Sequence, residues 1–421
     1  MRPSATILSA FVVLFSFSSA HAEPETPQKN TEPGPAAVRL DLPGVVKRVR
    51  EQAPSRRVSK RRIAEAEARL VDAEVFPRTN PLLEAAAGPR FSSGTDDVSI
   101  ALDVGLTQTV DLGGGLRARV DAARAGVEKA QADADASTRD IERVASKAFA
   151  RALGAEKRLA LAKQIEILSA ENAETASRRR QAGDATLLEL NVANGALARA
   201  TSEVRAREAD RAAALGELRF LLGLPPRAEI ALQGELTEVK PRPAAGGWLK
   251  RRPDVRALEA ELAVARAEER LADALAWPAL TFGAQYQFED RQVHTIQGVL
   301  GLTLPIFERS QGLAAEAAAR ARRIEAELEQ RRAEATTEAV TAAEVYGHQR
   351  AAADAFAREG LGALEQNLTL GKKAFQAGEI GLPELLSLQR ELVATQSEQL
   401  DRELAAALAA IDSRFATGGG Q

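Results

Sequence analysis

The sequence predicts a mainly α-helical protein that also carries membrane-type β-strands, and three observations lead to this class. Aromatic residues make up only 4% of the chain and charged residues 27%, a composition typical of long helices rather than of a compact mixed core. Residues 115–181 and 313–377 contain no proline, so each stretch can form one very long helix. Four shorter stretches alternate apolar and polar residues with the period of a strand.

The first 22 residues are predicted to be a secretory signal peptide. Arg2 is followed by a short apolar run and then by the tripeptide AHA, a pattern that predicts cleavage before Glu23. Residues 23–39 are polar and rich in proline, so we expect a disordered lead-in. Because the chain has no cysteine, we expect neither disulfides nor a lipid-anchored N-terminal cysteine.

The mature chain consists of two copies of one pattern. QAGDATLLEL at 181–190 and QAGEIGLPEL at 376–385 share six of ten residues, and segments 66–77 and 267–278 share seven of twelve, in the same order. Such internal similarity marks a repeated structural unit. The predicted boundaries are a first repeat at 40–224, a connecting segment at 225–249, a second repeat at 250–415 and a flexible tail at 416–421.

Each copy is predicted to contain a helix, two strands, a very long helix, a turn and a returning helix. In the first copy the opening helix is expected to stop at Phe76-Pro77, because proline ends a helix. At about 1.5 Å per residue, each proline-free stretch forms a rod of roughly 100 Å. The apolar residues of the rods keep coiled-coil spacing, as at Leu161, Ile165 and Leu168.

The strands are expected at 81–91, 98–107, 280–289 and 296–304. Their lengths suit tilted transmembrane strands, which have roughly 9–11 residues. One face of each is apolar and the other carries small polar residues, the pattern of a strand between lipid and water. A sheet packed on a soluble core is the alternative, but no other predicted element offers an apolar layer to cover it.

A single chain cannot close a membrane barrel from four strands. Open sheet edges are not stable in hydrocarbon, and closed membrane barrels start at about eight strands. The sequence therefore predicts that several copies pool their strands. A shared barrel continued by long rods would form a conduit.

The repeated QAG motifs mark the far ends of the rods. Gly183 and Gly378 stand where each helix must reverse, because glycine tolerates the left-handed conformation that ends a helix. Asp184 and Thr186 are candidates to cap the returning helix of the first copy.

Several motifs resemble the TolC-type outer-membrane efflux protein family over essentially the whole mature length. They are QTVDLGGGLRARVDAARAGVEKAQAD, RRPDVRALEAELAVARAEERLADALAWPAL, LGELRFLLGLPP and the two QAG motifs. GLTLPIFERSQGLAAEAAARAR and NPLL resemble the cation-efflux branch of the cobalt–zinc–cadmium type. Where that branch usually has an acidic-Gly-Gly-basic run, this chain has DLGGG at 111–115.

The resemblance implies a homotrimer in which twelve strands form a β-barrel in the outer membrane and twelve helices form a coiled-coil α-barrel through the periplasm. It also implies a periplasmic adaptor protein and an inner-membrane resistance-nodulation-division pump as partners. The implied function is passive conduction of substrate, with metal cations as the expected cargo, and not catalysis.

The helical tips are the candidate functional site. The residues expected to dock the adaptor are Gly183, Asp184, Thr186, Gly378, Glu379, Gly381 and Leu382. Glu384 matches the position of a pore-facing gate carboxylate in some family members, whereas the neighbouring gate acid falls on Ser387. Glu189 is the repeat equivalent of Glu384. An ordinary exposed glutamate is the alternative role for each carboxylate.

No cofactor, metal site or nucleic-acid partner is expected. Beyond residue 22 the chain has two histidines, no cysteine and no methionine, so soft or imidazole metal ligands are nearly absent. Positive and negative residues are interspersed, with a net charge of −3. The remaining alternatives are a soluble periplasmic coiled-coil adaptor, and a channel for drugs or for a secreted polypeptide.

Overall fold

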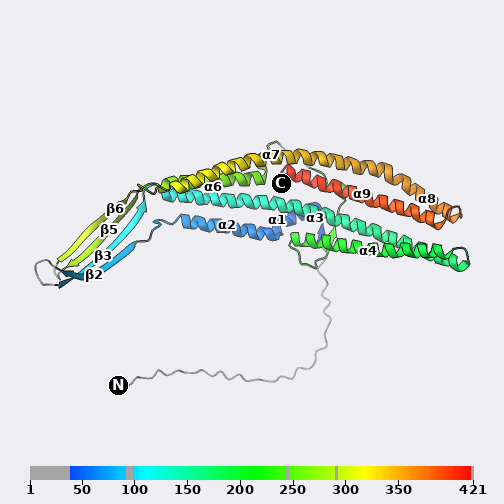
Figure 1. Ribbon diagram of the computed structural model, residues 1–421, viewed down its shortest axis with the longest axis horizontal. Helices are drawn as coiled ribbons and strands as arrows, with labels where there is room; N and C mark the ends of the chain where they lie inside the picture. The colour runs from blue at the N-terminus through cyan, green and yellow to red at the C-terminus, as the bar shows by residue number, and fades with distance from the viewer. Residues whose placement is uncertain (1–37, 92–97, 242–245, 290–292, 419–421) are drawn as a thin grey trace, which may run out of the picture. The chain divides into compact units, whose positions relative to one another are not determined.

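Long helices and a four-stranded β-sheet make up most of the described residues, with this sheet at one end of the helices (Figure 1). The computed structural model describes residues 38–91, 98–241, 246–289 and 293–418. Its first part contains β1 (Val38–Leu40), α1 (Leu42–Gln52), α2 (Pro54–Ala73), β2 (Leu82–Phe91), β3 (Val98–Asp111), α3 (Gly115–Ala182) and α4 (Leu187–Leu221). A connecting part contains β4 (Ile230–Leu232), η1 (Leu236–Glu238) and α5 (Trp248–Arg251). The remainder contains α6 (Pro253–Leu275), β5 (Ala279–Glu289), β6 (Val293–Thr303), α7 (Gln311–Phe356), η2 (Ala357–Leu361), α8 (Gly362–Gln376) and α9 (Leu382–Ala416).

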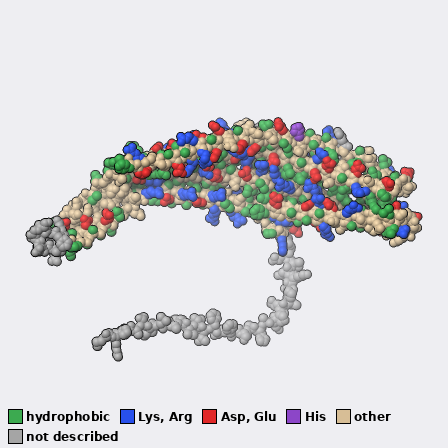
Figure 2. Space-filling view, viewed as in Figure 1, with side chains coloured by type: hydrophobic (Ala, Val, Ile, Leu, Met, Phe, Trp, Pro, Cys, Tyr) green, Lys and Arg blue, Asp and Glu red, His purple; other side chains and the backbone are tan. Residues whose placement is uncertain are grey.

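The four predicted strands are confirmed and form one antiparallel sheet in the order β2-β3-β5-β6. The register places Leu102 opposite Phe288 and Leu280 opposite Leu302, so the apolar residues share one face. That face is uncovered: Ile296 is 81% exposed. Charged side chains are sparse on the visible face of the sheet and dense over the helices (Figure 2). Within the described chain, β2 and β6 each have only one neighbouring strand.

The first predicted rod is confirmed almost to the residue, since α3 is a single helix of 68 residues. It packs against α2 and α6 in the part nearer the sheet, and against α4 and α9 in the other part (Figure 1). Helices α7 and α8 make the second rod, along which α9 returns. Among the described residues, no helix combines the length and the apolar composition that crossing a membrane requires.

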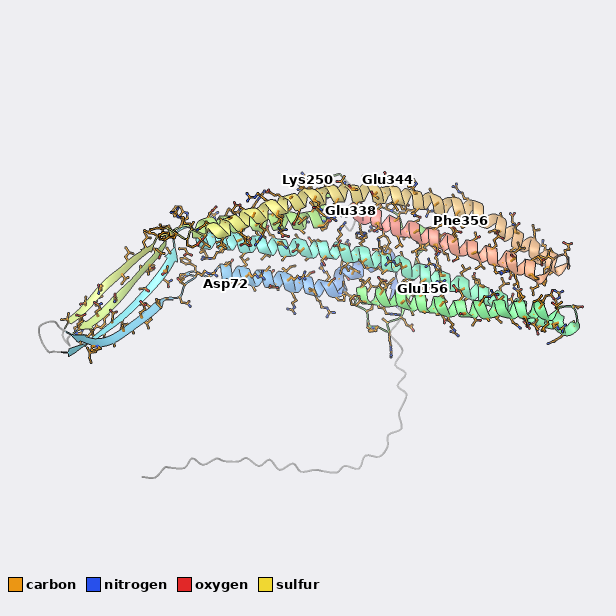
Figure 3. All side chains as sticks on the ribbon, in the orientation of Figure 1. Asp72, Glu156, Lys250, Glu338, Glu344 and Phe356 are labelled. Carbon is orange, nitrogen blue, oxygen red and sulfur yellow. The ribbon has the colours of Figure 1, made fainter. Side chains whose placement is uncertain are left out.

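The second rod differs from the single helix predicted over 313–377. A π-helical turn, η2, separates α7 from α8 just beyond Phe356 (Figure 3). A π turn inserts one extra residue into a helix, and Gly360 and Gly362 lower the helical propensity at this place. Helix α9 packs against the turn, where the Arg402 guanidinium lies 4.6 Å from the centre of the Phe356 ring. The two rods are therefore similar in sequence but not in continuity.

Several predicted boundaries move by a few residues. Helix α2 ends at Ala73, ahead of the expected stop at Phe76-Pro77. Strand β1 begins at Val38, inside the expected lead-in of 23–39, and pairs in parallel with β4, inside the expected connection of 225–249. The predicted signal peptide lies outside the described residues, as do 23–37 of the lead-in and 419–421 of the tail.

A buried core joins the helices midway along the rods. Phe149 of α3, Leu218 of α4 and Phe415 of α9 are at most 2% exposed and belong to one apolar cluster with β1 and β4 residues. Ala148 and Ala152 in the same cluster are small enough to let neighbouring helices approach closely. The small sheet of β1 and β4 therefore fastens the start of the described chain to this core.

A buried ionic cluster ties the start of α6 to the end of α9. Arg252 is completely buried; its Nε donates to Asp254 Oδ1 at 2.9 Å and its Nη1 donates to the Ala416 carbonyl oxygen at 2.9 Å. Its Nη2 also pairs with Glu338 of α7. Arg331 Nη2 donates to Asp254 Oδ2 at 2.6 Å. The motif RRPDVR thus encodes a junction between three helices.

The cluster holds its carboxylates in the charged form. Burial raises the pKa of Asp254, but three arginines outweigh burial, so the pKa lies below its usual value. They act through the hydrogen bond and charge of Arg252, the charge of Arg139 and the hydrogen bond of Arg331. Arg139 adds a second tie to α9, because its Nη2 donates to the Phe415 carbonyl oxygen at 2.7 Å. A cation at a helix C-terminus also complements the helix dipole.

Replacing Asp254 by Asn should lower the free energy of unfolding by about 1.5–3 kcal/mol, because the buried Arg252 loses one of its two carboxylate partners and keeps Glu338. Since the folded pKa of Asp254 is lowered, its stabilising effect is present above the unfolded value of about 3.9 and is lost as the pH falls below it. The difference between wild type and variant should therefore shrink in acid. Denaturant unfolding followed by circular dichroism measures both effects.

The control is Glu67→Gln, which removes one exposed carboxylate from α2 and should change stability by no more than about 0.5 kcal/mol. Equal stability of Asp254→Asn and wild type at neutral pH would contradict the role of the cluster.

Candidate functional site

The two helix reversals lie at the end of the rods farthest from the sheet (Figure 1). In the first, Gly183 has a φ of 87°, and the Asp184 N–H donates to the Arg179 carbonyl oxygen at 2.8 Å. In the second, Gly378 has a φ of 76°, and the Glu379 N–H donates to a carbonyl oxygen of the preceding turn at 2.9 Å. The two copies thus use the same left-handed glycine to end the outgoing helix, as the sequence predicts.

Helix α4 begins with a reciprocal cap. The Glu189 N–H donates to Thr186 Oγ1 at 3.2 Å, and the Thr186 N–H donates to Glu189 Oε2 at 2.7 Å. Of the two candidate caps, Thr186 takes this role and Asp184 does not. The carboxylate of Glu189 therefore stabilises the turn, a role that sequence reasoning did not assign to it.

Helix α9 begins differently, because its N-cap is Gly381 and offers no side chain. A Cβ atom at Gly381 would lie 2.8 Å from Glu384 Oε2, so the carboxylate folds back over the glycine. Within the described chain Glu384 forms no hydrogen bond or ion pair with another side chain. Glu384 and Ser387 are both exposed and lie one turn apart on one face of α9. Of the two equivalent carboxylates, Glu189 is bound in a helix cap, whereas that of Glu384 is not.

The two tips pack against each other. Leu382 and Leu386 of α9 form a small apolar cluster with alanines of α3 and α4, including Ala176. The guanidinium of Arg179 lies 5.4 Å from the centre of the Phe375 ring. Movement of either tip alone would have to break these contacts.

The predicted docking residues do not all lie on the surface. Leu382 is only 4% exposed, because it fills the contact between the tips. Gly381 is half-buried. The exposed members of the set are Gly183, Asp184, Thr186, Gly378 and Glu379.

Sequence reasoning missed a groove of about 420 Å³ between α3, α4 and α9. Leu161, Ile165 and Leu168 of α3 line it, with Val192 of α4 and Val393 of α9. The coiled-coil spacing on α3 was a signal for an apolar face, but the other walls come from helices distant in sequence. The groove also has arginines in its lining, at Arg158, Arg199, Arg207 and Arg390.

The described residues contain no group of three or more histidine, aspartate or glutamate side chains placed to hold a metal ion. The arrangement at the tips offers backbone turns, exposed carboxylates and a tight apolar contact. Such a site suits recognition by another protein or control of a passage.

Comparison with known proteins identifies the family to which the chain belongs. The sequence profile of the outer membrane efflux protein family matches residues 55–224 and 247–419, one match for each copy of the repeat. The pyoverdine export outer membrane protein OpmQ of Pseudomonas putida is 26% identical over 81% of this chain and 74% of its own length. The cobalt-zinc-cadmium resistance protein CzcC of Cupriavidus metallidurans is 29% identical over 67% of this chain and 69% of its own length.

The fold is also that of solved outer-membrane channels. The structure of the CmeC channel of Campylobacter jejuni superposes with a TM-score of 0.74 at 16% identity, covering 90% of this chain and 86% of CmeC. The two profile matches confirm the internal repeat, and together they span most of the chain. The chain therefore belongs to the outer membrane efflux protein family.

Proposed function

We propose that this chain is the outer-membrane channel subunit of a tripartite efflux system. In this role it conducts substrate passively to the exterior from an inner-membrane pump and a periplasmic adaptor. The observation that carries the proposal is the sheet: it has two open edges and an apolar face that no part of the described chain covers. Lipid can cover such an apolar face, and strands of neighbouring copies can form hydrogen bonds with the open edges.

A homotrimer follows as the proposed assembly. Three copies supply twelve strands, and β6 of one copy would pair with β2 of the next, because these are the two edges of the sheet. The small polar residues of the other face, such as Thr281 and Gln285, would then line a water-filled barrel. The helices would continue the barrel as a periplasmic tunnel, since α3 alone extends roughly 100 Å at about 1.5 Å per residue.

The tips are the proposed contact with the adaptor, which would link the tunnel to an inner-membrane resistance-nodulation-division pump. Their exposed turns carry Asp184 in one copy and Glu379 in the other. Glu384 and Ser387 are the proposed gate residues, with Glu384 supplying the carboxylate. Glu189 keeps a place in the gate proposal as the repeat equivalent, although its carboxylate already caps α4.

Metal cations are the proposed cargo, supported by the similarity to a cobalt-zinc-cadmium resistance protein. The similarity to a pyoverdine export protein supports the alternative of a cargo other than metal cations, with drugs and a secreted polypeptide as the candidates. With neither cysteine nor methionine beyond residue 22, the chain offers few soft ligands, so recognition of a particular metal would belong to another component of the system.

Leu300→Lys and Val299→Lys test the membrane assignment with adjacent residues of β6. Leu300 shares the apolar face, whereas Val299 belongs to the polar face. A lysine at position 300 should cost about 2–4 kcal/mol per copy if it lies near the middle of the bilayer, and should abolish the outer-membrane trimer. A lysine at position 299 should be tolerated in the lumen. Trimer bands in unheated gels of outer-membrane fractions report the result.

Two results would contradict this assignment. One is equal tolerance of both lysines. The other is a wild-type protein that purifies without detergent as a monomer and does not bind bilayers, as expected for a soluble adaptor.

Glu384→Ala tests the gate. Three carboxylates around a narrow axis would bind cations and restrict the pore, so the variant should show a higher single-channel conductance and weaker block by divalent cations. Glu189→Ala is the matched comparison. Because its carboxylate is already bound in the cap of α4, this variant should change conductance and block less than Glu384→Ala does. Unchanged conductance and block in Glu384→Ala would rule out the gate role while leaving the channel itself intact.

A further inference from the structure

A hydrogen-bonded chain of polar side chains links β3, β5 and β6 on the polar face of the sheet. Gln285 Nε2 and Gln287 Nε2 of β5 donate to Asp103 Oδ2 of β3, at 2.6 Å and 2.9 Å. Gln297 Nε2 of β6 donates to Gln287 Oε1 at 2.9 Å. Asp103 is therefore held in place by two amides, and its other oxygen, Oδ1, has no partner among the described residues.

A second carboxylate lies on the neighbouring row of the same face. The register places Asp103 beside Ala86 of β2, while Glu84 lies two residues away on that strand and opposite Gly105. Glu84 is exposed and makes no hydrogen bond or ion pair with another described residue. These two rows hold no lysine or arginine on any of the four strands. Every charged side chain in these two rows is therefore a carboxylate.

We propose that Asp103 is the charge-selectivity determinant of the conduit and favours inorganic cations over anions. The inference rests on the proposed channel function, in which the polar face lines the lumen. Symmetry then places one Asp103 from each copy at the same height, with Glu84 beside it. Rings of acidic side chains attract cations and repel anions of similar size. The glutamine amides fix the ring, and the free Oδ1 faces the passing ion.

A purely structural role is the competing explanation, in which Asp103 only orients the glutamines. Variants separate the two roles. Asp103→Asn has nearly the same shape, can still accept amide hydrogen bonds and removes the charge. Asp103→Glu keeps the charge and changes the geometry. If Asp103→Asn loses the selectivity and Asp103→Glu keeps it, the role of Asp103 is electrostatic.

The measurement is the reversal potential of the full-length trimer in a planar bilayer across a tenfold gradient of KCl. At about one Debye length from the carboxylates, roughly 10 Å at 0.1 M salt, the loss of three charges should lower the cation-to-anion permeability ratio about fivefold. Asp103→Lys should abolish the preference, because the three lysines then stand beside three Glu84 carboxylates and their charges cancel. Asp103→Glu should retain it. The effect should nearly vanish near 1 M salt, where the Debye length is about 3 Å.

The control is Glu67→Gln, which makes the same change of charge on α2, outside the sheet. It should leave the reversal potential unchanged. If Asp103→Asn and Asp103→Lys trimers keep the wild-type selectivity, the assignment of Asp103 is wrong, but the channel proposal is unaffected. If the folded wild-type protein forms no channels at all, the proposed function is wrong, and the selectivity role is wrong with it.

Discussion

The rest of the structure depends on one constraint: the four-stranded sheet can neither pair the backbone groups at its edges nor cover its own apolar face. Four strands leave two rows of backbone groups unpaired, and the apolar face has no layer of its own to cover it. The helices obey the same constraint. Strand order β2-β3-β5-β6 continues into the helix order α2-α3-α6-α7, because neighbouring helices in that series pack together. An open sheet therefore runs into an open layer of helices with the same two edges.

The repeat explains how one chain builds this layer, and the differences between copies show where the halves have separate tasks. Both turns end on a left-handed glycine, but the first returning helix is capped by Thr186 and the second begins at Gly381 without a side-chain cap. The first rod is one continuous helix, whereas the second contains the π turn η2. The second copy thus combines the weaker cap, the interrupted rod and the free carboxylate of Glu384. Because it has fewer local stabilising interactions, we expect the second copy to open locally at a lower free energy than the first.

The sequence predicts the periodic elements well because their signals are local. The alternation in 280–289 and the absence of proline in 115–181 locate β5 and α3 within two residues. The π turn is missed because its glycines lower helical propensity without indicating an extra residue per turn. The role of Arg252 is missed because its partner carbonyl belongs to Ala416, 164 residues away. Long-range contacts of this kind have no signature in a single sequence.

The tips show the same limit at the scale of single residues. Capping by Thr186 is readable from the sequence, since a threonine followed three residues later by Glu189 is a capping pattern. The burial of Leu382 is not readable, because it depends on how α9 meets α3 and α4. A resemblance to a family shows which residues correspond to functional positions. Whether each side chain is buried, capping or free depends on packing that differs between the two copies.

In the proposed channel, the assigned gate and the assigned charge filter lie at the two ends of the molecule, away from the central junction. The carboxylates of the central junction, Asp254 and Glu338, are already neutralised by buried or half-buried arginines. Glu384 at the tips and Glu84 and Asp103 on the sheet have no cationic partner among the described residues. Roughly a rod's length separates these groups, far beyond the Debye length of about 8 Å at physiological salt. The two ends therefore act on a passing ion independently, so a gate at one end and a charge filter at the other can be tuned separately.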